Sequence, residues 1–271
     1  MVIRHNLSAM NANRQLSINN DSQSKSIEKL SSGYRINRAG DDAAGLAISE
    51  KMRSQIRGLN QGSTNAQDGI SLIQTTEGTL SETQAMLQRL KTLSTQASTG
   101  TLTSSDRANV QLEVAQLGSE ITRLAANTTF NGNNVLSKAG SVAFQVGADA
   151  GQKIHLTLQC ASAGALGLTS AVLDLSTSAL ASVAMAKIES AINQVSSMRA
   201  TLGAVQNRLE HTVTATDNTS ENLSAAESRI RDVDMAKEMM NYSSQKVLVS
   251  AAQSMLSQAN QTSQGVLSLL Q

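Results

Sequence analysis

The 271-residue sequence contains no proline and no tryptophan, and only two tyrosines and two phenylalanines. Ordinary proteins contain about 5% proline, and a proline inside a helix costs about 3 kcal/mol. Its complete absence therefore favours very long helices. The scarcity of aromatic side chains argues against a globular enzyme, because enzyme cores take much of their buried area from them.

The sequence also has very little cysteine and almost no net charge. A single cysteine, Cys160, excludes an internal disulfide and any metal site built from several cysteines. Lys and Arg number 22 against 21 for Asp and Glu, so the formal net charge is +1, whereas binders of nucleic acids or acidic membranes carry a basic excess. No apolar run reaches the roughly 18 residues of a membrane span. We expect neither a nucleic-acid nor a membrane partner.

The sequence offers no catalytic or metal-binding constellation. Its three histidines are scattered, and none belongs to an HExxH pair. Cys160 has no histidine placed beside it as a general base, so it is a poor candidate nucleophile. The early glycines do not follow a strand in the spacing of a phosphate-binding loop. We expect no enzyme activity, no metal and no cofactor.

Apolar residues recur at spacings of three and four along most of the chain, which predicts amphipathic helices. These patterns cover residues 2–33, 46–98, 104–129, 180–230 and 232–271. Gly33 predicts a stop for the first helix. The apolar spacing over 180–230 is a nearly unbroken heptad seam, typical of a coiled coil. Glycines at 62, 69 and 78 weaken the second pattern, by about 1 kcal/mol each relative to alanine.

Two stretches interrupt the helical patterns. Tyr34–Gly45 carries mixed charge and two glycines, which predicts a linker. Two runs of alternating apolar residues, at 142–146 and 154–158, predict a β-hairpin. Residues 159–177 are rich in Gly, Ala and Ser, and we interpret them as an irregular connection.

The predicted fold is mainly α: an elongated antiparallel helical bundle or coiled coil, with a small β-hairpin at the tip and the N- and C-terminal helices paired. We divide the chain into an N-terminal helix and linker (1–45), long helices of a middle domain (46–129), the hairpin and connection (130–178), the C-terminal long helix of the middle domain (179–231) and a C-terminal helix (232–271).

The terminal helices carry more apolar surface than one molecule can cover. Neither is long enough to be stable alone in water, and the apolar face of the last one is too broad for a single neighbour. Other copies of the chain are expected to cover it, and a non-closing contact between identical subunits gives a helical polymer. The expected polymerisation interface comprises Ile3, Leu7, Met10, Ile27, Leu30, Met235, Met239, Tyr242, Val249, Leu256, Leu267 and Leu270.

Three motifs resemble those of bacterial flagellins, in the same order and at both ends of the chain. LSSGYRINRAGDDAAGLAIS, at residues 30–49, resembles the family pattern LSSGxRIN…DDAAGxAI. FNGNNVL, at 130–136, resembles the family's FNG element. The last run begins SRIRDVD at Ser228 and contains QANQ and VLSLL, and it resembles the family's C-terminal ending.

The sequence departs from the family pattern at a few positions. Ser263 stands where many members have proline, Arg231 where an acidic residue is common, and Tyr34 where a smaller residue is usual. The large outer domains of many flagellins have no counterpart here. The resemblance is therefore to a short flagellin with core domains alone.

The resemblance implies a structural subunit that self-assembles into the helical flagellar filament, outside the cell, for motility. It also implies a flagellar export chaperone, a filament cap and hook-junction proteins as partners. Residues 1–20 lack the apolar stretch of a cleavable signal peptide, which fits a flagellum-specific type III export route. A hook–filament junction protein is the alternative with the most similar design. A secreted coiled-coil adhesin or effector would need a binding domain, and none is visible.

The resemblance also points to two groups of site residues. In the linker, Arg35, Asn37, Arg38, Asp41 and Asp42 are expected to lock packing between subunits or domains through ion pairs and hydrogen bonds. A solvated turn is the alternative, because exposed ion pairs contribute only about 0–1 kcal/mol.

Some flagellins are recognised by an innate immune receptor of the Toll-like class through their middle helices. Arg89, Leu93 and Glu113 match the family positions involved. Ordinary residues of a helix surface are the alternative interpretation of these three.

Overall fold

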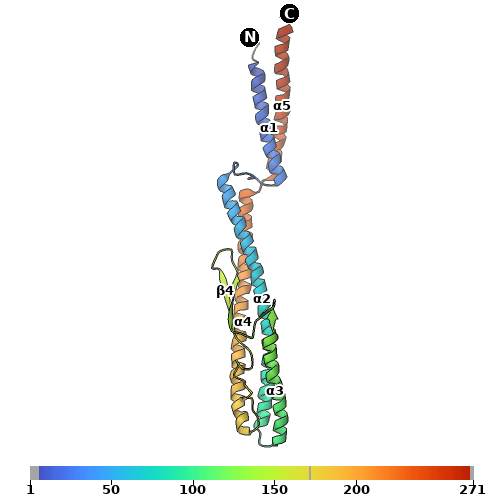
Figure 1. The fold of residues 1–271 in the computed structure, drawn as a ribbon. Helices are drawn as coiled ribbons and strands as arrows, with labels where there is room; N and C mark the ends of the chain where they lie inside the picture. Colours follow the sequence, from blue (N-terminus) through green and yellow to red (C-terminus); the bar gives the residue numbers. More distant parts are fainter. Residues whose placement is uncertain (1–5, 171, 269–271) are drawn as a thin grey trace. The chain divides into compact units, whose positions relative to one another are not determined.

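The computed structural model describes residues 6–170 and 172–268, without the side chains of 263–268. Within these residues it contains five helices: α1 (Leu7–Ser32), α2 (Ala43–Ser98), α3 (Ser104–Asn127), α4 (Ser178–Arg231) and α5 (Met235–Ser268) (Figure 1). Four short strands follow α3: β1 (Thr129–Phe130), β2 (Asn133–Asn134), β3 (Gly140–Gln145) and β4 (Lys153–Leu158). The predicted mainly helical class is confirmed.

The chain divides into two compact units. We call residues Met1–Ser54 with Glu221–Gln271 the terminal unit, and Gln55–Ser220 the bundle unit. The boundaries lie inside α2 and α4, whereas the sequence pattern placed segment boundaries at 45/46 and 231/232. A break in a helix is visible in a sequence, but a boundary inside a continuous helix is not.

The core of the bundle unit lies between α2, α3 and α4. On α4 the buried residues alternate at spacings of three and four from Ala181 to Leu209, as expected for a coiled-coil seam. At the two ends of the pattern predicted over 180–230, burial shifts by one position. Ala181 is buried whereas Leu180 is exposed, and Ser220 is buried whereas Thr219 is exposed.

The predicted hairpin forms as β3 and β4, which pair antiparallel with Val142 opposite Leu156. Its expected position at the tip is wrong, because it lies along α2 instead (Figure 1). A Cβ atom on Gly62 would lie 2.6 Å from the carbonyl oxygen of Val146. A Cβ atom on Gly69 would likewise crowd the ring of Phe144. Positions i and i+7 share a helix face, so these two glycines open one side of α2 to the hairpin.

The connection after β4 is irregular, as predicted, yet it is well packed. Leu166, Leu173 and Leu175 belong to the core of the bundle unit. Gln111 of α3 holds the segment: its Nε2 donates to the Leu173 carbonyl oxygen at 2.8 Å, and its Oε1 accepts from the Leu175 amide at 2.8 Å. The segment thus closes one side of the three helices.

Candidate interaction surface on the terminal helices

Helices α1 and α5 form an antiparallel pair in the terminal unit (Figure 1), which confirms the predicted pairing of the chain ends. The side chain of Asn6 accepts a hydrogen bond from the Ala9 amide at the start of α1, and its Nδ2 donates to the Ala259 carbonyl oxygen of α5 at 3.0 Å. At the other end of α1, Gly33 has a left-handed φ of 74° and provides the predicted stop.

Covered positions on the two helices include runs at alternating spacings of three and four, which we call the inner seam. They are Ala9, Ala12, Leu16, Asn19, Gln23, Ser26 and Leu30 on α1, and Tyr242, Gln245, Val249, Ala252, Leu256 and Ala259 on α5. Most are small or polar. Since burial of a large aliphatic side chain contributes about 1.5–3 kcal/mol, this seam stabilises the pair only modestly.

Larger apolar side chains point away from the inner seam and form three exposed stripes. With 3.6 residues per turn, Leu7, Met10 and Ile18 lie on the face of α1 opposite its seam, and we call them the α1 stripe. On α5, Met235 and Met239 lie on one side of its seam and form the first α5 stripe. The second α5 stripe consists of Met240 and Val247, which lie opposite the seam, and Met255, which lies on its other side. All eight side chains are exposed.

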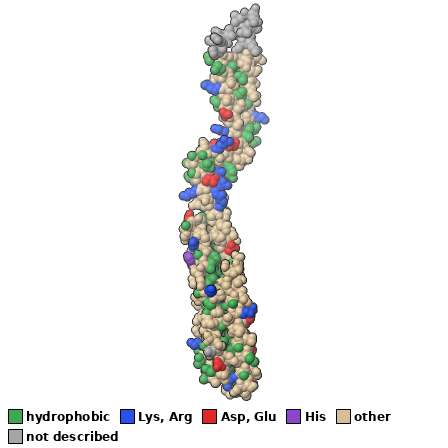
Figure 2. Space-filling model, viewed as in Figure 1, with side chains coloured by type: hydrophobic (Ala, Val, Ile, Leu, Met, Phe, Trp, Pro, Cys, Tyr) green, Lys and Arg blue, Asp and Glu red, His purple; other side chains and the backbone are tan. Residues whose placement is uncertain are grey.

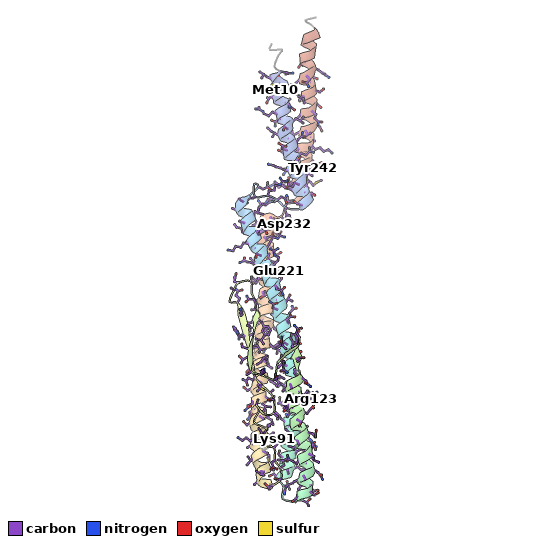
Figure 3. All side chains as sticks on the ribbon, viewed as in Figure 1. Met10, Lys91, Arg123, Glu221, Asp232 and Tyr242 are labelled. Atoms are coloured by element: carbon purple, nitrogen blue, oxygen red, sulfur yellow. The ribbon has the colours of Figure 1, made fainter. Side chains whose placement is uncertain are left out.

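Figure 2 shows such hydrophobic side chains on the surface of the terminal unit, and Figure 3 labels Met10 and Tyr242 near opposite ends of the helix pair. A shallow groove runs between the two helices beside the second α5 stripe. Ala12, Gln15 and Asn19 line it from α1, and Leu248 and Met255 from α5. A contiguous exposed apolar surface is typical of an interaction site.

The structure separates the residues predicted for the polymerisation interface into two groups. Leu7, Met10, Ile27, Met235 and Met239 are exposed. Leu30, Tyr242, Val249 and Leu256 face the inner seam and are half-buried or buried. Ile3 and Leu270 lie outside the described residues, as does the side chain of Leu267.

Sequence reasoning left several exposed apolar residues out of the predicted interface: Ile18, Met240, Val247, Leu248 and Met255. A helical wheel centred on the small residues of each helix would have found them, because it places the seam first and the large apolar residues around it.

In the linker, two predicted residues satisfy backbone amides of the linker and of the next helix. Oδ2 of Asp41 accepts hydrogen bonds from the amides of Arg38 and Asn37, both at 3.1 Å. These two hydrogen bonds lower the pKa of Asp41 below its ordinary value. Oδ1 of Asp42 accepts from the Gly45 amide at 2.8 Å, in the first turn of α2. Both carboxylates therefore fix the local path of the chain.

The two predicted arginines connect the linker to other helices. The Arg35 amide donates to the carbonyl oxygen of Arg231 at 2.6 Å, and its guanidinium donates to that of Ile230, so Arg35 binds the C-terminal end of α4. Nε of Arg38 pairs with Oε1 of Glu28 on α1 at 2.9 Å. The linker thus holds the ends of α1 and α4 in place.

The linker contains one cluster that sequence reasoning missed. The guanidinium carbon of Arg231 lies 4.7 Å from the centroid of the Tyr34 ring, a cation–π contact. Its Nη1 lies 2.5 Å from Oε1 of Glu50, and this hydrogen bond lowers the pKa of Glu50. Tyr34 and Arg231 are two of the positions where the sequence departs from the family pattern. The fact that both positions depart from the pattern was the signal in the sequence that could have revealed this contact.

The three residues predicted to contact an immune receptor lie in different environments. Arg89 of α2 and Glu113 of α3 form an exposed ion pair, with Nη2 and Oε1 2.8 Å apart, and the pair raises the pKa of Arg89. The side chain of Leu93 is only 2% exposed and packs in the core of the bundle unit. The structure therefore brings two of the three together at the surface and places the third beneath it.

Within the described residues, no helix combines the length and the apolar character needed to cross a lipid bilayer. The same part of the chain contains no group of three His, Cys, Asp or Glu side chains that could hold a metal ion. The Cys160 thiol is half-buried and donates to the Ser137 carbonyl oxygen at 3.1 Å.

Comparison with known proteins places the chain in a family. Residues 3–141 match the bacterial flagellin N-terminal helical region, and residues 185–270 match the C-terminal helical region. A flagellin of Halalkalibacterium halodurans is 52% identical over 271 residues, the full length of both chains. The crystal structure of Bacillus cereus flagellin is 30% identical, with a TM-score of 0.51, and covers 60% of this chain and 94% of that one.

A Vibrio parahaemolyticus structure described as a flagellar hook-associated protein is similar in fold alone. It has a TM-score of 0.60 at 12% identity, over 71% of this chain and 100% of that one. The two family regions and the full-length relative, together with the paired terminal helices, lead to one conclusion: the chain belongs to the bacterial flagellin family.

Proposed function

We propose that this chain is the structural subunit of a flagellar filament and polymerises with copies of itself through α1 and α5. The three exposed stripes on the terminal helix pair carry this proposal. Members of this family are structural proteins rather than enzymes. The function therefore lies in contacts between subunits and not in a catalytic site.

The directions of the stripes support a polymer rather than a dimer. A single partner covers one side of a helix pair, but the α1 stripe and the two α5 stripes face three directions. Each subunit therefore needs several neighbours to remove this apolar surface from water. Identical subunits joined through non-equivalent surfaces continue indefinitely and form a helical array.

The test is assembly of the purified full-length chain. A salt that strengthens apolar burial, such as ammonium sulfate, is added, and the product is examined by electron microscopy. We expect long helical filaments of uniform diameter. A double variant with Met240→Glu and Val247→Glu places charge on the second α5 stripe and should stay monomeric, with an unchanged helical circular dichroism spectrum. Absence of filaments from the unmodified chain under all salt conditions would contradict the proposal.

The same experiment separates the filament subunit from the hook–filament junction alternative. Fold similarity does not separate the two classes, because a structure described as hook-associated shares the fold. A junction protein is not expected to form long filaments alone. The three flagellin motifs along the chain favour the filament subunit.

The remaining partners rest on family membership. We expect a flagellar export chaperone to bind the free subunit, and filament cap and hook-junction proteins to contact the assembled end. The exposed α5 stripes are suitable surfaces for the chaperone, since they are free only before assembly. Loss of chaperone binding in the Met240→Glu/Val247→Glu variant, measured by calorimetry, would support this.

Recognition by a Toll-like receptor remains a prediction. Arg89 and Glu113 are accessible on the bundle unit, whereas Leu93 can act only by supporting that surface from below. A receptor-reporter assay on monomer should lose its signal with Arg89→Ala. No activation by the unmodified monomer would refute the prediction.

A further inference from the structure

The methionines of this chain are unevenly exposed. Among the described residues, the exposed ones are Met10 on α1 and Met235, Met239, Met240 and Met255 on α5. On α2 and α4, Met198 is buried, and Met52, Met86 and Met185 are half-buried. The exposed methionines therefore lie on the terminal helix pair, and each of the three stripes contains at least one of them.

We propose that these five methionines, which we call the terminal methionines, form a reversible oxidation site through which peroxides block assembly. The proposal rests on the proposed function, because it assigns a regulation to the same surface. Methionine is oxidised reversibly to the sulfoxide, and we expect exposed methionines to react first. All five residues are exposed in the single chain, and the proposed polymer would cover them with neighbouring subunits.

The chemistry balances with hydrogen peroxide as the oxidant. A lone pair of the thioether sulfur attacks one peroxide oxygen, so that an S–O bond forms and the O–O bond breaks. The second oxygen leaves as water after proton transfer. Sulfur loses two electrons and the peroxide gains them. A sulfoxide reductase reverses the step with two thiols, which become a disulfide while the oxygen leaves as water.

The inner seam contains no methionine along its described length, so oxidation alters none of the side chains that form the seam, although Met255 lines the groove beside it. The new sulfoxide groups stand on the stripes, where assembly must remove them from water. Burial of a polar group without a hydrogen-bond partner is unfavourable by about 1–3 kcal/mol in proteins. Oxidation is therefore expected to prevent association without unfolding the subunit.

The experiment uses full-length protein with Cys160→Ser, so that the half-buried thiol does not contribute. Monomer is treated with hydrogen peroxide, the modified residues are identified by peptide mass spectrometry, and the critical concentration for polymerisation is measured by sedimentation. We expect sulfoxide first at the terminal methionines, an unchanged circular dichroism spectrum, and a critical concentration raised by at least about tenfold. A sulfoxide reductase with dithiothreitol should restore the original value. Preformed filaments should be protected at the same residues.

Two variants make the test specific. Replacing the five terminal methionines by leucine keeps the stripes apolar, so this variant should polymerise normally and resist peroxide. The control carries Met86→Leu and Met185→Leu in the bundle unit and should remain sensitive. An unchanged critical concentration after oxidation of the unmodified methionines, or equal inhibition of the five-leucine variant, would overturn the inference. If untreated protein fails to polymerise at all, the proposed function is itself wrong.

Discussion

Replacing Leu7 by glutamine should weaken assembly while leaving the folded subunit intact. Leu7 is 70% exposed in the isolated chain, so its side chain contributes little to the α1–α5 contact. Full burial of a leucine contributes about 1.5–3 kcal/mol, and the exposed part of this one therefore has about 1–2 kcal/mol to gain in a subunit interface. Loss of that gain should raise the critical concentration by a factor of about 5–30.

The bundle unit provides a matched control. Leu112 on α3 is 68% exposed, so Leu112→Gln changes the same side chain at nearly the same exposure outside the terminal helices. Glutamine and leucine have similar helix propensities, which keeps both helices comparable. The critical concentration is measured by sedimentation over a protein dilution series, and thermal unfolding of each monomer is followed by circular dichroism.

The two variants should behave differently. Leu7→Gln should shift the critical concentration and not the midpoint of unfolding, and Leu112→Gln should shift neither substantially. An equal rise in critical concentration for both variants would show that general surface hydrophobicity drives assembly. A large loss of monomer stability in Leu7→Gln would show that Leu7 packs within the chain.

Three further predictions concern the folded subunit. Gly62→Ala should destabilise the bundle unit in urea, because the added Cβ would lie 2.6 Å from a backbone oxygen of the hairpin, whereas Gly78→Ala meets no atom within 4 Å and should stabilise α2 by up to about 1 kcal/mol. Two linker amides lower the pKa of Asp41. The ionised Asp41 carboxylate therefore stabilises the fold fully above the ordinary pKa of 3.8, and this stabilisation is lost as the pH falls through the lower folded value. Asp41→Asn should abolish this contribution of Asp41 to the acid dependence of thermal unfolding. Arg231→Ala should return the pKa of Glu50 toward its ordinary 4.5, as read by carbon NMR of its carboxyl group, and a Glu50 pKa that stays low would refute the role given to Arg231.

The long helices and the seam of α4 were predictable because their signal is a repeated spacing. From Ala184 to Leu209, the apolar residues of α4 follow the three–four alternation, and the buried residues of this helix match that pattern. The hairpin was predictable for a similar reason, since its alternation of apolar residues has period two. The end of α1 at Gly33 was predictable from the conformational freedom of glycine.

Features that depend on contacts between distant segments were not predictable. In the sequence alone, the glycines at 62 and 69 only weaken a helix. Their role is explained by the hairpin that packs beside them. The strands β1 and β2 are a local exception. Asn131 and Gly132 have φ values of 49° and 78°. Asn-Gly is a strong signal for a two-residue hairpin, so these two strands could have been predicted from the sequence.

On α1, the apolar pattern alone does not separate the residues that face α5 from those that face outward. A stripe of large apolar residues normally predicts the face toward the core. Here Leu7 and Met10 face outward, while Ala9, Ala12 and Asn19 face α5. The rule fails because it assumes that the core lies within one chain, whereas a subunit of a polymer keeps its largest apolar residues for its neighbours.

The small and polar composition of the inner seam has a kinetic consequence. Local opening of a helix pair requires little free energy when few apolar contacts are lost. Backbone amides of α1 and α5 should therefore exchange with deuterated solvent well before those of α4 within the bundle unit. A free subunit can then have a transiently open end and a durable middle. Incorporation into the polymer, by contrast, should slow exchange most at the two ends of the chain.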